Sequence, residues 1–277
     1  MQRSFETPGP VTLDLRIPTG EIEIQPTLDG RVEVELVAHD EESQALVDAA
    51  RIEQHGDHIH VEVPHKRGGF GFQFFFGRSG ISCRVKCPPS SNLEVRSKSA
   101  DVLGRGTLGN VSVNTASGEV ELRIVDGNLG VKSASGDIQA ERVGGNASLH
   151  TASGDVFLGF VGGTATVNGV SGDVRIGEAI ADTSVTTVSG DQQHEAVFGG
   201  SVTAQSVSGD VLVAVRRGAK VYLDCNTLSG DTSSELDMTG EPAGDGPLIE
   251  IRVKTVSGDI TITRAPAPAD SAQEVHA

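Results

Sequence analysis

Hydrophobic and polar residues alternate along most of this chain, in short stretches separated by recurring turns. The tripeptide Ser-Gly-Asp, once Ser-Gly-Glu, begins at Ser117, Ser135, Ser153, Ser171, Ser189, Ser208, Ser229 and Ser257. The spacing is constant from Ser117 to Ser189 and widens after that, and Ser99-Ala100-Asp101 is a degenerate copy one period before the first. A period of this kind is typical of a solenoid, in which each repeat forms one coil.

Each repeat is predicted to contain two strands and two tight turns. Positions six, four and one before the serine are mostly apolar, and so are positions three, five and about eight after it; in one repeat these are Val111, Val113, Ala116, Val120, Leu122 and Val125. A second turn follows about ten residues after the serine, as at Gly144-Gly145-Asn146, and Gly and Asn accept the positive φ that such corners require. We therefore expect about six inward side chains per coil, buried between two sheets.

This pattern predicts an all-β protein, a single-stranded β-solenoid with coils of about 18 residues over residues 96–264. Residues 1–95 read as strands around one short helical stretch near residues 41–52, and Thr19-Gly20-Glu21 is similar to a repeat turn. We expect this region to be a β-rich cap with a Phe-rich loop, because an open solenoid end exposes sheet edges. Residues 265–277 are rich in Ala and Pro and are expected to form a disordered tail.

Three motifs together resemble a known family. They are PTGEIEI near the start, a strand followed by proline in VKCPPSSNLEV, and the serial T-x-S-G-D-V turns. The combination resembles the bacterial putative-adhesin family of β-strand repeat proteins, a domain of unknown function, over most of residues 10–264. The resemblance implies a β-solenoid and a role in adhesion, and it carries over no active site.

The charge excludes some partners. The chain has 22 Lys and Arg against 38 Asp and Glu, a net charge of −16, which repels nucleic acid and anionic lipid headgroups. No apolar stretch is long enough for a signal peptide or a transmembrane span, so the chain as given is expected to be cytoplasmic, with surface exposure left open. An odd number of cysteines argues against a disulfide scaffold, and Cys83, Cys87 and Cys225 are expected to be buried thiols.

The first candidate surface is a Thr-rich face. Thr115, Thr151, Thr187 and Ser206 lie among uncharged positions before the turns, including Asn114 and Thr186, that are predicted to point outward. Such a face could dock a polysaccharide, a peptide strand or another copy of the protein. Equally, Thr is an ordinary residue for an exposed strand, where it pairs across neighbouring coils.

One coil breaks the apolar pattern. Gln192 and His194 stand where the neighbouring coils have Val174 and Ile176. Burying both side chains unpaired would cost several kcal/mol, so we expect a bulge that turns them outward. The alternatives are an internally paired polar core and a functional site.

The turn aspartates form a second periodic feature. Stacked carboxylates repel one another, and a cation such as Ca²⁺ would compensate for this repulsion. The favoured alternative is that each side chain accepts hydrogen bonds from the backbone N–H groups of its own turn. We accordingly predict no cofactor and no metal ligand set.

Five of the nine Phe residues fall within residues 70–76, in a Gly-rich stretch that includes Phe72, Phe74, Phe75 and Phe76. This segment is interpreted either as an apolar loop that contacts a partner, a membrane surface or a second protomer, or as a plug in the end of the solenoid.

No motif for phosphate binding, nucleophilic catalysis or dinucleotide binding occurs in the sequence. The function predicted from these patterns is non-enzymatic: a binding scaffold for an unknown macromolecule, either protein or polysaccharide. Two alternatives remain open. One is a carbohydrate-active β-helix enzyme, and the other is a structural protein that assembles through its solenoid ends or its Phe-rich loop.

Overall fold

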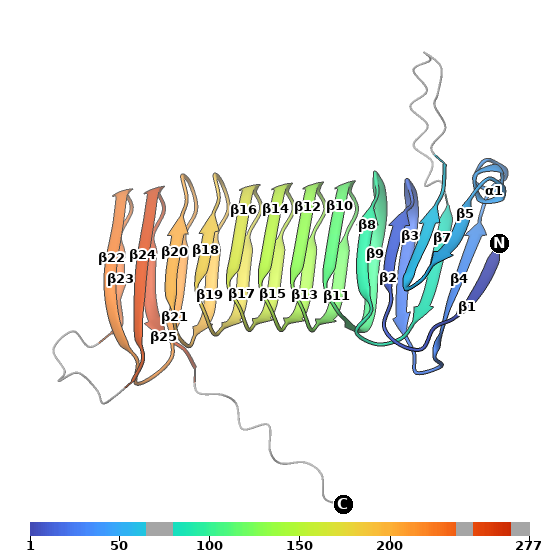
Figure 1. The fold of residues 1–277 in the computed structure, drawn as a ribbon. Helices are drawn as coiled ribbons and strands as arrows, with labels where there is room; N and C mark the ends of the chain where they lie inside the picture. Colours follow the sequence, from blue (N-terminus) through green and yellow to red (C-terminus); the bar gives the residue numbers. More distant parts are fainter. Residues whose placement is uncertain (65–79, 237–245, 267–277) are drawn as a thin grey trace, which may run out of the picture.

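The computed structural model describes residues 1–64, 80–236 and 246–266. These residues form a long solenoid of two facing sheets with one short helix at its N-terminal end, so the predicted all-β solenoid is confirmed (Figure 1). The Phe-rich stretch that contains Phe72, Phe74, Phe75 and Phe76 lies outside the described residues.

The two sheets have 13 and 12 strands. The first runs in the order β1 (Gln2–Glu6), β4 (Arg31–Ala38), β7 (Ile81–Cys87), β3 (Thr19–Pro26), β9 (Ser99–Leu108), β11 (Val120–Val125), β13 (Ile138–Val143), β15 (Val156–Val161), β17 (Val174–Ala179), β19 (Gln192–Val197), β21 (Val211–Val215), β25 (Ile260–Arg264), β23 (Thr232–Ser234). The second runs in the order β22 (Lys220–Ser229), β24 (Leu248–Ser257), β20 (Ser201–Gln205), β18 (Thr183–Thr186), β16 (Ala165–Ser171), β14 (Ala147–Ser153), β12 (Leu129–Ser135), β10 (Val111–Ser117), β8 (Asn92–Arg96), β2 (Thr12–Arg16), β6 (His58–Glu62), β5 (Arg51–His55).

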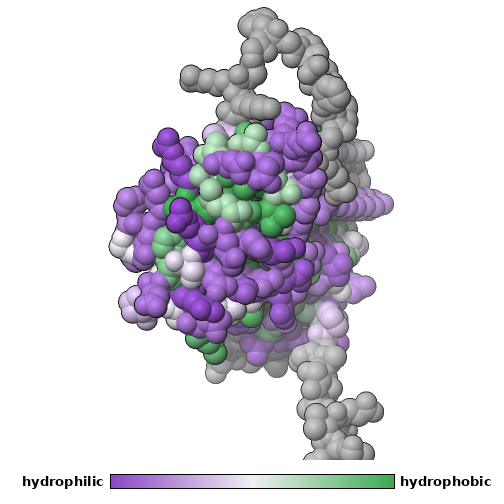
Figure 2. Space-filling model, turned by 90° about the vertical axis from the view of Figure 1, so that its right-hand side faces the viewer, coloured by the Kyte–Doolittle hydropathy of each residue, from purple (hydrophilic) through white to green (hydrophobic). Residues whose placement is uncertain are grey.

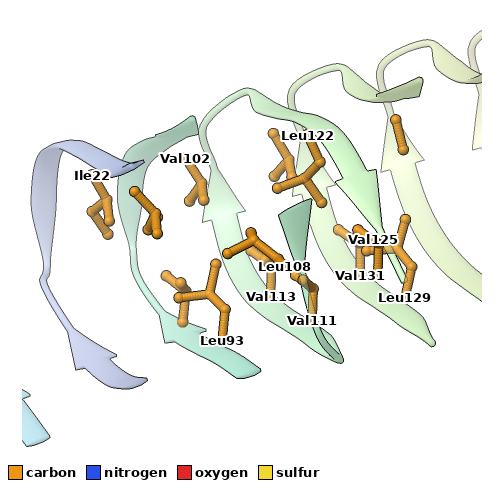
Figure 3. Close-up of a cluster of buried hydrophobic side chains, with 14 of the residues drawn as sticks. Ile22, Leu93, Val102, Leu108, Val111, Val113, Leu122, Val125, Leu129 and Val131 are labelled. Atoms are coloured by element: carbon orange, nitrogen blue, oxygen red, sulfur yellow. The ribbon is translucent and has the colours of Figure 1, made fainter. Parts of the chain in front are cut away.

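Each repeat places one strand in each sheet, and successive coils pair in parallel and in register. Val111 lies beside Leu129, and Val120 lies beside Ile138, each one full repeat further along the chain. The inward side chains therefore stack in aliphatic rows between the sheets (Figure 3). Fully burying a side chain such as Leu122 or Val131 contributes about 1.5–3 kcal/mol relative to leaving it exposed, so these rows hold the sheets together.

The Ser-Gly-Asp corner depends on its glycine. Gly136 and Gly154 have φ values of 114° and 115°, a region that side chains with a Cβ atom rarely adopt. A Cβ atom on Gly154 would also lie 2.4 Å from the carbonyl oxygen of Gly136 in the preceding coil. The period of the glycines is thus the period of closest backbone approach between coils.

The first coil lies within the N-terminal region. β2 and β3 pair in parallel with β8 and β9, and Gly20 stands beside Ala100 in the turn position, with a φ of 119°. The expected helical stretch is shorter than predicted: α1 (Glu41–Asp48) begins after Asp40, whose carboxylate accepts the N–H of Ser43 at 2.7 Å. Ile52, which we expected in the helix, belongs to β5.

Antiparallel strands close the N-terminal end. β1 pairs with β4, and β4 with β7, in one sheet, and β5 pairs with β6 in the other. Figure 2, which views this end of the molecule, shows a mostly hydrophilic surface around a small apolar patch. In the residues that the structure describes, no helix is long and apolar enough to cross a membrane.

The last two coils are stacked out of sequence order. The coil of β24 and β25 lies next to the coil of β20 and β21, and the earlier coil of β22 and β23 lies outside it (Figure 1). The chain therefore passes over one position and later returns to fill it. This crossing accompanies the two widest gaps between turn serines, from Ser208 to Ser229 and from Ser229 to Ser257.

Candidate binding surface

Six consecutive strands of the 12-stranded sheet, β10 to β20, present a surface that we call the hydroxyl-amide face. It consists of Ser112, Asn114, Gly130, Lys132, Ser148, His150, Thr166, Asn168, Ser184, Thr186, Thr203 and Gln205. None of these residues is a carboxylate, although the chain contains 38 Asp and Glu. The face is therefore set apart from the rest of an acidic molecule.

Parallel pairing arranges the hydroxyl-amide face in two columns. One column runs from Ser112 to Thr203 and the other from Asn114 to Gln205, with one residue of each column per strand. Neighbouring strands in a sheet are about 4.8 Å apart, so each column repeats one outward position at that spacing. Every position except Gly130 carries a polar side chain, so a ligand that lies along the solenoid axis meets polar groups at regular intervals.

Charged residues stand at both ends of the hydroxyl-amide face. On β8, Arg96 lies 3.8 Å from Glu94 and 3.9 Å from Asp14. At the other end, Arg252 on β24 forms an ion pair with Glu250. The stretch without carboxylates thus has defined limits along the axis.

Two shallow hollows mark this sheet surface. One of about 530 Å³ includes Asn110, Asn128 and Asn146 at the second turn together with Ser112, Gly130 and Ser148. The other, of about 410 Å³, includes Lys132, His150 and Asn168 near the Ser-Gly-Asp corner. Small side chains and glycine leave this space open above the strands.

The Thr-rich face predicted from the sequence is wrong in its orientation. Thr115, Thr151, Thr187 and Ser206 are buried, with 8%, 6%, 2% and 7% of their surface exposed. The strict alternation of the strand continues to the turn, so the position two before the serine points inward and the position one before it, such as Ala116, points outward. The exposed members of the predicted set, such as Asn114 and Thr186, remain on the hydroxyl-amide face.

The buried hydroxyls fit the interior because they are hydrogen-bonded at the corner. Thr151 Oγ1 donates to the carbonyl oxygen of Ser153 at 2.9 Å, and Thr115 Oγ1 donates to that of Ser117 at 3.1 Å. Thr187 Oγ1 donates to Ser206 Oγ at 3.3 Å in the next coil. A hydroxyl that satisfies a turn carbonyl can be buried at little cost, which the hydrophobic pattern alone does not reveal.

The expected outward bulge at Gln192 and His194 is wrong. Both side chains are 1% exposed, and both residues pair in register with Val174 and Ile176 in the preceding coil. Gln192 Nε2 donates to Thr187 Oγ1 and to the carbonyl oxygen of Gln205, each at 2.8 Å. These bonds offset part of the cost of burial, and the backbone pairing of β19 with β17 holds both residues in place.

His194 is the polar residue with the least compensation. Neither ring nitrogen has a hydrogen-bond partner, and burial lowers its pKa from 6.5 to about 4. The coil of β18 and β19 also divides the hydrophobic interior, since Val185 belongs to one buried cluster and Val197 to the next. A polar layer therefore interrupts the core at one coil.

The turn aspartates interact between coils. Asp137 Oδ1 accepts the backbone N–H of Asp155 at 2.8 Å, and Asp155 Oδ1 accepts that of Asp173 at 2.8 Å. The same bond recurs up to Asp259, whose carboxylate accepts the N–H of Asp231. Six of the seven turn aspartates therefore bond to the next coil, and not to their own turn as we expected. Among the described residues, no group of three or more His, Cys, Asp and Glu is arranged to hold a metal ion.

The sequence pattern did not predict an exposed row of apolar side chains near these turns. Val170, Val188, Val207 and Val256 are 46–50% exposed and stand one residue before their turn serines. Their period matched the core pattern, so we expected them to point inward. Only the steric alternation up to the turn could have separated them from the core.

The family model that matches the chain is described as Toastrack DUF4097, and it matches residues 12–263. The comparison with curated proteins finds no match. Among solved structures, a putative adhesin from Bacteroides fragilis has 14% identity and a TM-score of 0.50, covering 95% of this chain and 96% of that chain.

Two structures from Parabacteroides distasonis are also similar. One is described as a putative lipid binding protein, with 13% identity, a TM-score of 0.48, and 95% and 96% of the two chains covered. The other is a putative adhesin with 13% identity, a TM-score of 0.43, and 94% and 96% covered. With the family match spanning nearly all the coils, the chain belongs to the Toastrack DUF4097 family.

Proposed function

We propose that this protein is a non-enzymatic binding scaffold and that its hydroxyl-amide face binds an extended, uncharged polysaccharide. The observation that carries the proposal is the run of six in-register strands whose outward residues include no carboxylate. An uncharged polymer gains hydrogen bonds there without meeting the negative charge found elsewhere on the molecule. The adhesin name of the Bacteroides fragilis structure falls in the same class of non-enzymatic binding proteins.

The repeat explains how weak contacts would add to useful affinity. Ser, Thr, Asn and Gln side chains both donate and accept hydrogen bonds, as sugar hydroxyls do. Nine of the twelve positions in the two columns carry such groups at regular spacing, so a polymer with regular spacing contacts many of them at once. The hollow beside Lys132, His150 and Asn168 leaves room for groups that project from the polymer.

The carboxylates favour binding over hydrolysis. Glycosidases need two carboxyl groups that flank the scissile bond. The hydroxyl-amide face has none, and the turn aspartates already accept backbone N–H groups of the neighbouring coils. We therefore expect the protein to bind and release the polysaccharide without hydrolysing it.

The test is a glycan array followed by affinity electrophoresis of the full chain in gels that contain the best-bound neutral polysaccharide. His150→Glu and Asn168→Glu should each abolish the retardation, because they place carboxylates in the middle of the face. The matched control is Gln139→Glu, an exposed position on the outer surface of the 13-stranded sheet, which should leave retardation intact.

Two results would contradict the proposal. Equal retardation of wild type and both face variants would show that the polymer binds elsewhere. New reducing ends that increase with protein concentration would show turnover and would assign the protein to the enzymes.

A further inference from the structure

The two ends of the solenoid differ in how they terminate. At the N-terminal end the edge strands β1 and β5 are antiparallel additions, and almost all of their side chains are exposed. At the C-terminal end, β22 continues the parallel stacking of the coils. β1 and β5 each have one partly buried apolar residue that packs against the core, whereas β22 has three, so β22 offers a further strand the longer apolar row.

The inward row of β22 is only partly covered. Val221, Leu223 and Cys225 pack against the last core cluster from outside, whereas Ile249, Ile251 and Val253 in the next coil inward are fully buried. Tyr222, the one tyrosine of the chain, is 56% exposed on the same strand. In the described residues no strand pairs with the outer edge of β22, so its outward backbone groups have no sheet partner.

The sequence of β22 is complementary to itself in one direction. Lys220 and Asp224 lie two residues to either side of Tyr222 and, like Tyr222, point away from the inward row. Antiparallel pairing about a twofold axis at Tyr222 sets each Lys220 opposite Asp224 of the second copy. Parallel pairing would instead set lysine beside lysine and aspartate beside aspartate.

We propose that the C-terminal end of the solenoid is a self-association surface, where β22 pairs antiparallel with β22 of a second copy of this chain. The pairing forms two symmetry-related Lys220–Asp224 contacts and brings the two Tyr222 rings together. Val221 then lies opposite Leu223 of the second copy, so the partly covered row becomes interior on both sides. The two interiors join into one core, and the capped N-terminal ends point away from each other.

The experiment is light scattering on the full chain as it elutes from a sizing column, over a range of loading concentrations. The mass is expected to rise from 28.7 kDa to twice that value. Lys220→Asp and Asp224→Lys should each weaken the dimer by at least about tenfold, because each substitution creates two like-charge contacts. The double variant Lys220→Asp/Asp224→Lys restores opposite charges and should restore the wild-type dissociation constant.

A native thiol gives a second readout. Cys83 and Cys87 are fully buried, so Cys225 is the cysteine that a maleimide reaches in the folded chain. Its labelling rate should fall as the protein concentration rises, and it should stay constant in Lys220→Asp. Arg123→Asp, on the outer surface of β11, is the matched charge control and should leave both mass and labelling as in the wild type.

A chain that remains at 28.7 kDa at every concentration would overturn the proposal. So would a dimer in which Cys225 is labelled equally at all concentrations, because that dimer would use another surface. Failure of the double variant to restore association, with an unchanged unfolding temperature, would exclude the antiparallel pairing.

Discussion

Gln192 and Thr187 meet inside the solenoid from opposite sides, where the Gln192 amide nitrogen donates to the Thr187 hydroxyl at 2.8 Å. In the described chain, this is the one coil whose inward residues include a Gln and a His. The bond orients the Gln192 side chain, but the Gln192 amide oxygen and both ring nitrogens of His194 have no hydrogen-bond partner. This coil therefore buries unpartnered polar atoms in a mostly aliphatic core, and its composition leads to two predictions.

Replacing His194 with Val should stabilise the protein. Val213 occupies the same inward position in the next coil, so the valine side chain fits the register. Removing a buried imidazole without hydrogen bonds should raise the free energy of unfolding by about 1–3 kcal/mol, measured by denaturant unfolding at pH 7.5. Val213→Ala, a control at the neighbouring position, should lower it; a destabilised His194→Val would show that the imidazole is compensated in the fold.

The same histidine should make the protein acid-sensitive. The unfolded chain binds a proton on His194 below about pH 6.5, whereas the folded chain does so only near pH 4, because burial lowers the pKa of the imidazole. The free energy of unfolding therefore decreases as the pH falls through this window, by about 3 kcal/mol in total.

The difference between the wild type and His194→Val isolates this contribution, since both carry the same carboxylates. The stability advantage of His194→Val should grow between pH 7 and pH 4.5. A constant difference across that range would mean that the folded chain binds the proton as readily as the unfolded one.

Two glycines in neighbouring coils should respond in opposite ways to substitution by alanine. Gly154→Ala should destabilise the protein by more than about 2 kcal/mol, because its φ is 115° and the new Cβ atom would lie 2.4 Å from a carbonyl oxygen. At Gly169 the new Cβ atom would meet methyl groups of Thr187 and Thr151 at 3.5 and 3.9 Å. Gly169→Ala should stabilise by about 0.4–1 kcal/mol, and thermal unfolding of both variants measures the contrast.

In the row of turn aspartates, replacing one carboxylate with an amide should affect stability differently from replacing it with a methyl group. Asp173→Asn keeps an oxygen that can accept the N–H of Asp191, now 2.9 Å away, and removes one charge from a row of like charges. Its unfolding temperature should equal or exceed that of the wild type. Asp173→Ala loses the acceptor and should be less stable by about 1 kcal/mol, and added salt should narrow the gap between the wild type and Asp173→Asn.

The sequence was sufficient for the architecture because the turn glycines and the aliphatic alternation repeat with one period. It misplaced Thr151 and Ala116, because a threonine and an alanine are both compatible with either side of a strand, and the deciding factor is the pleat near the corner. It also misjudged His194, since the in-register pairing of β19 with β17 outweighs the cost of burying one imidazole.

The stacking order of the last coils could not be read from the repeat either. The wide gap between Ser229 and Ser257 allows a long turn or a passage over one position, and the turn motif is the same in both cases. The hydroxyl-amide face was predicted in part, since Asn114 and Thr186 were recognised as outward and uncharged. Lys132 and the limits of the face emerged only from the register of the strands.

The exchanged order of the last two coils also constrains how the chain is completed as it is synthesised. β22 and β23 pair only with β24 and β25 in the described chain, and these strands are made later. When the ribosome has released the chain only as far as β23, the strands with which β22 and β23 pair have not yet been made. We therefore expect folding from the N-terminus to stop at β21 until β24 and β25 emerge, so that a chain ending at β23 lacks two docked coils, not one.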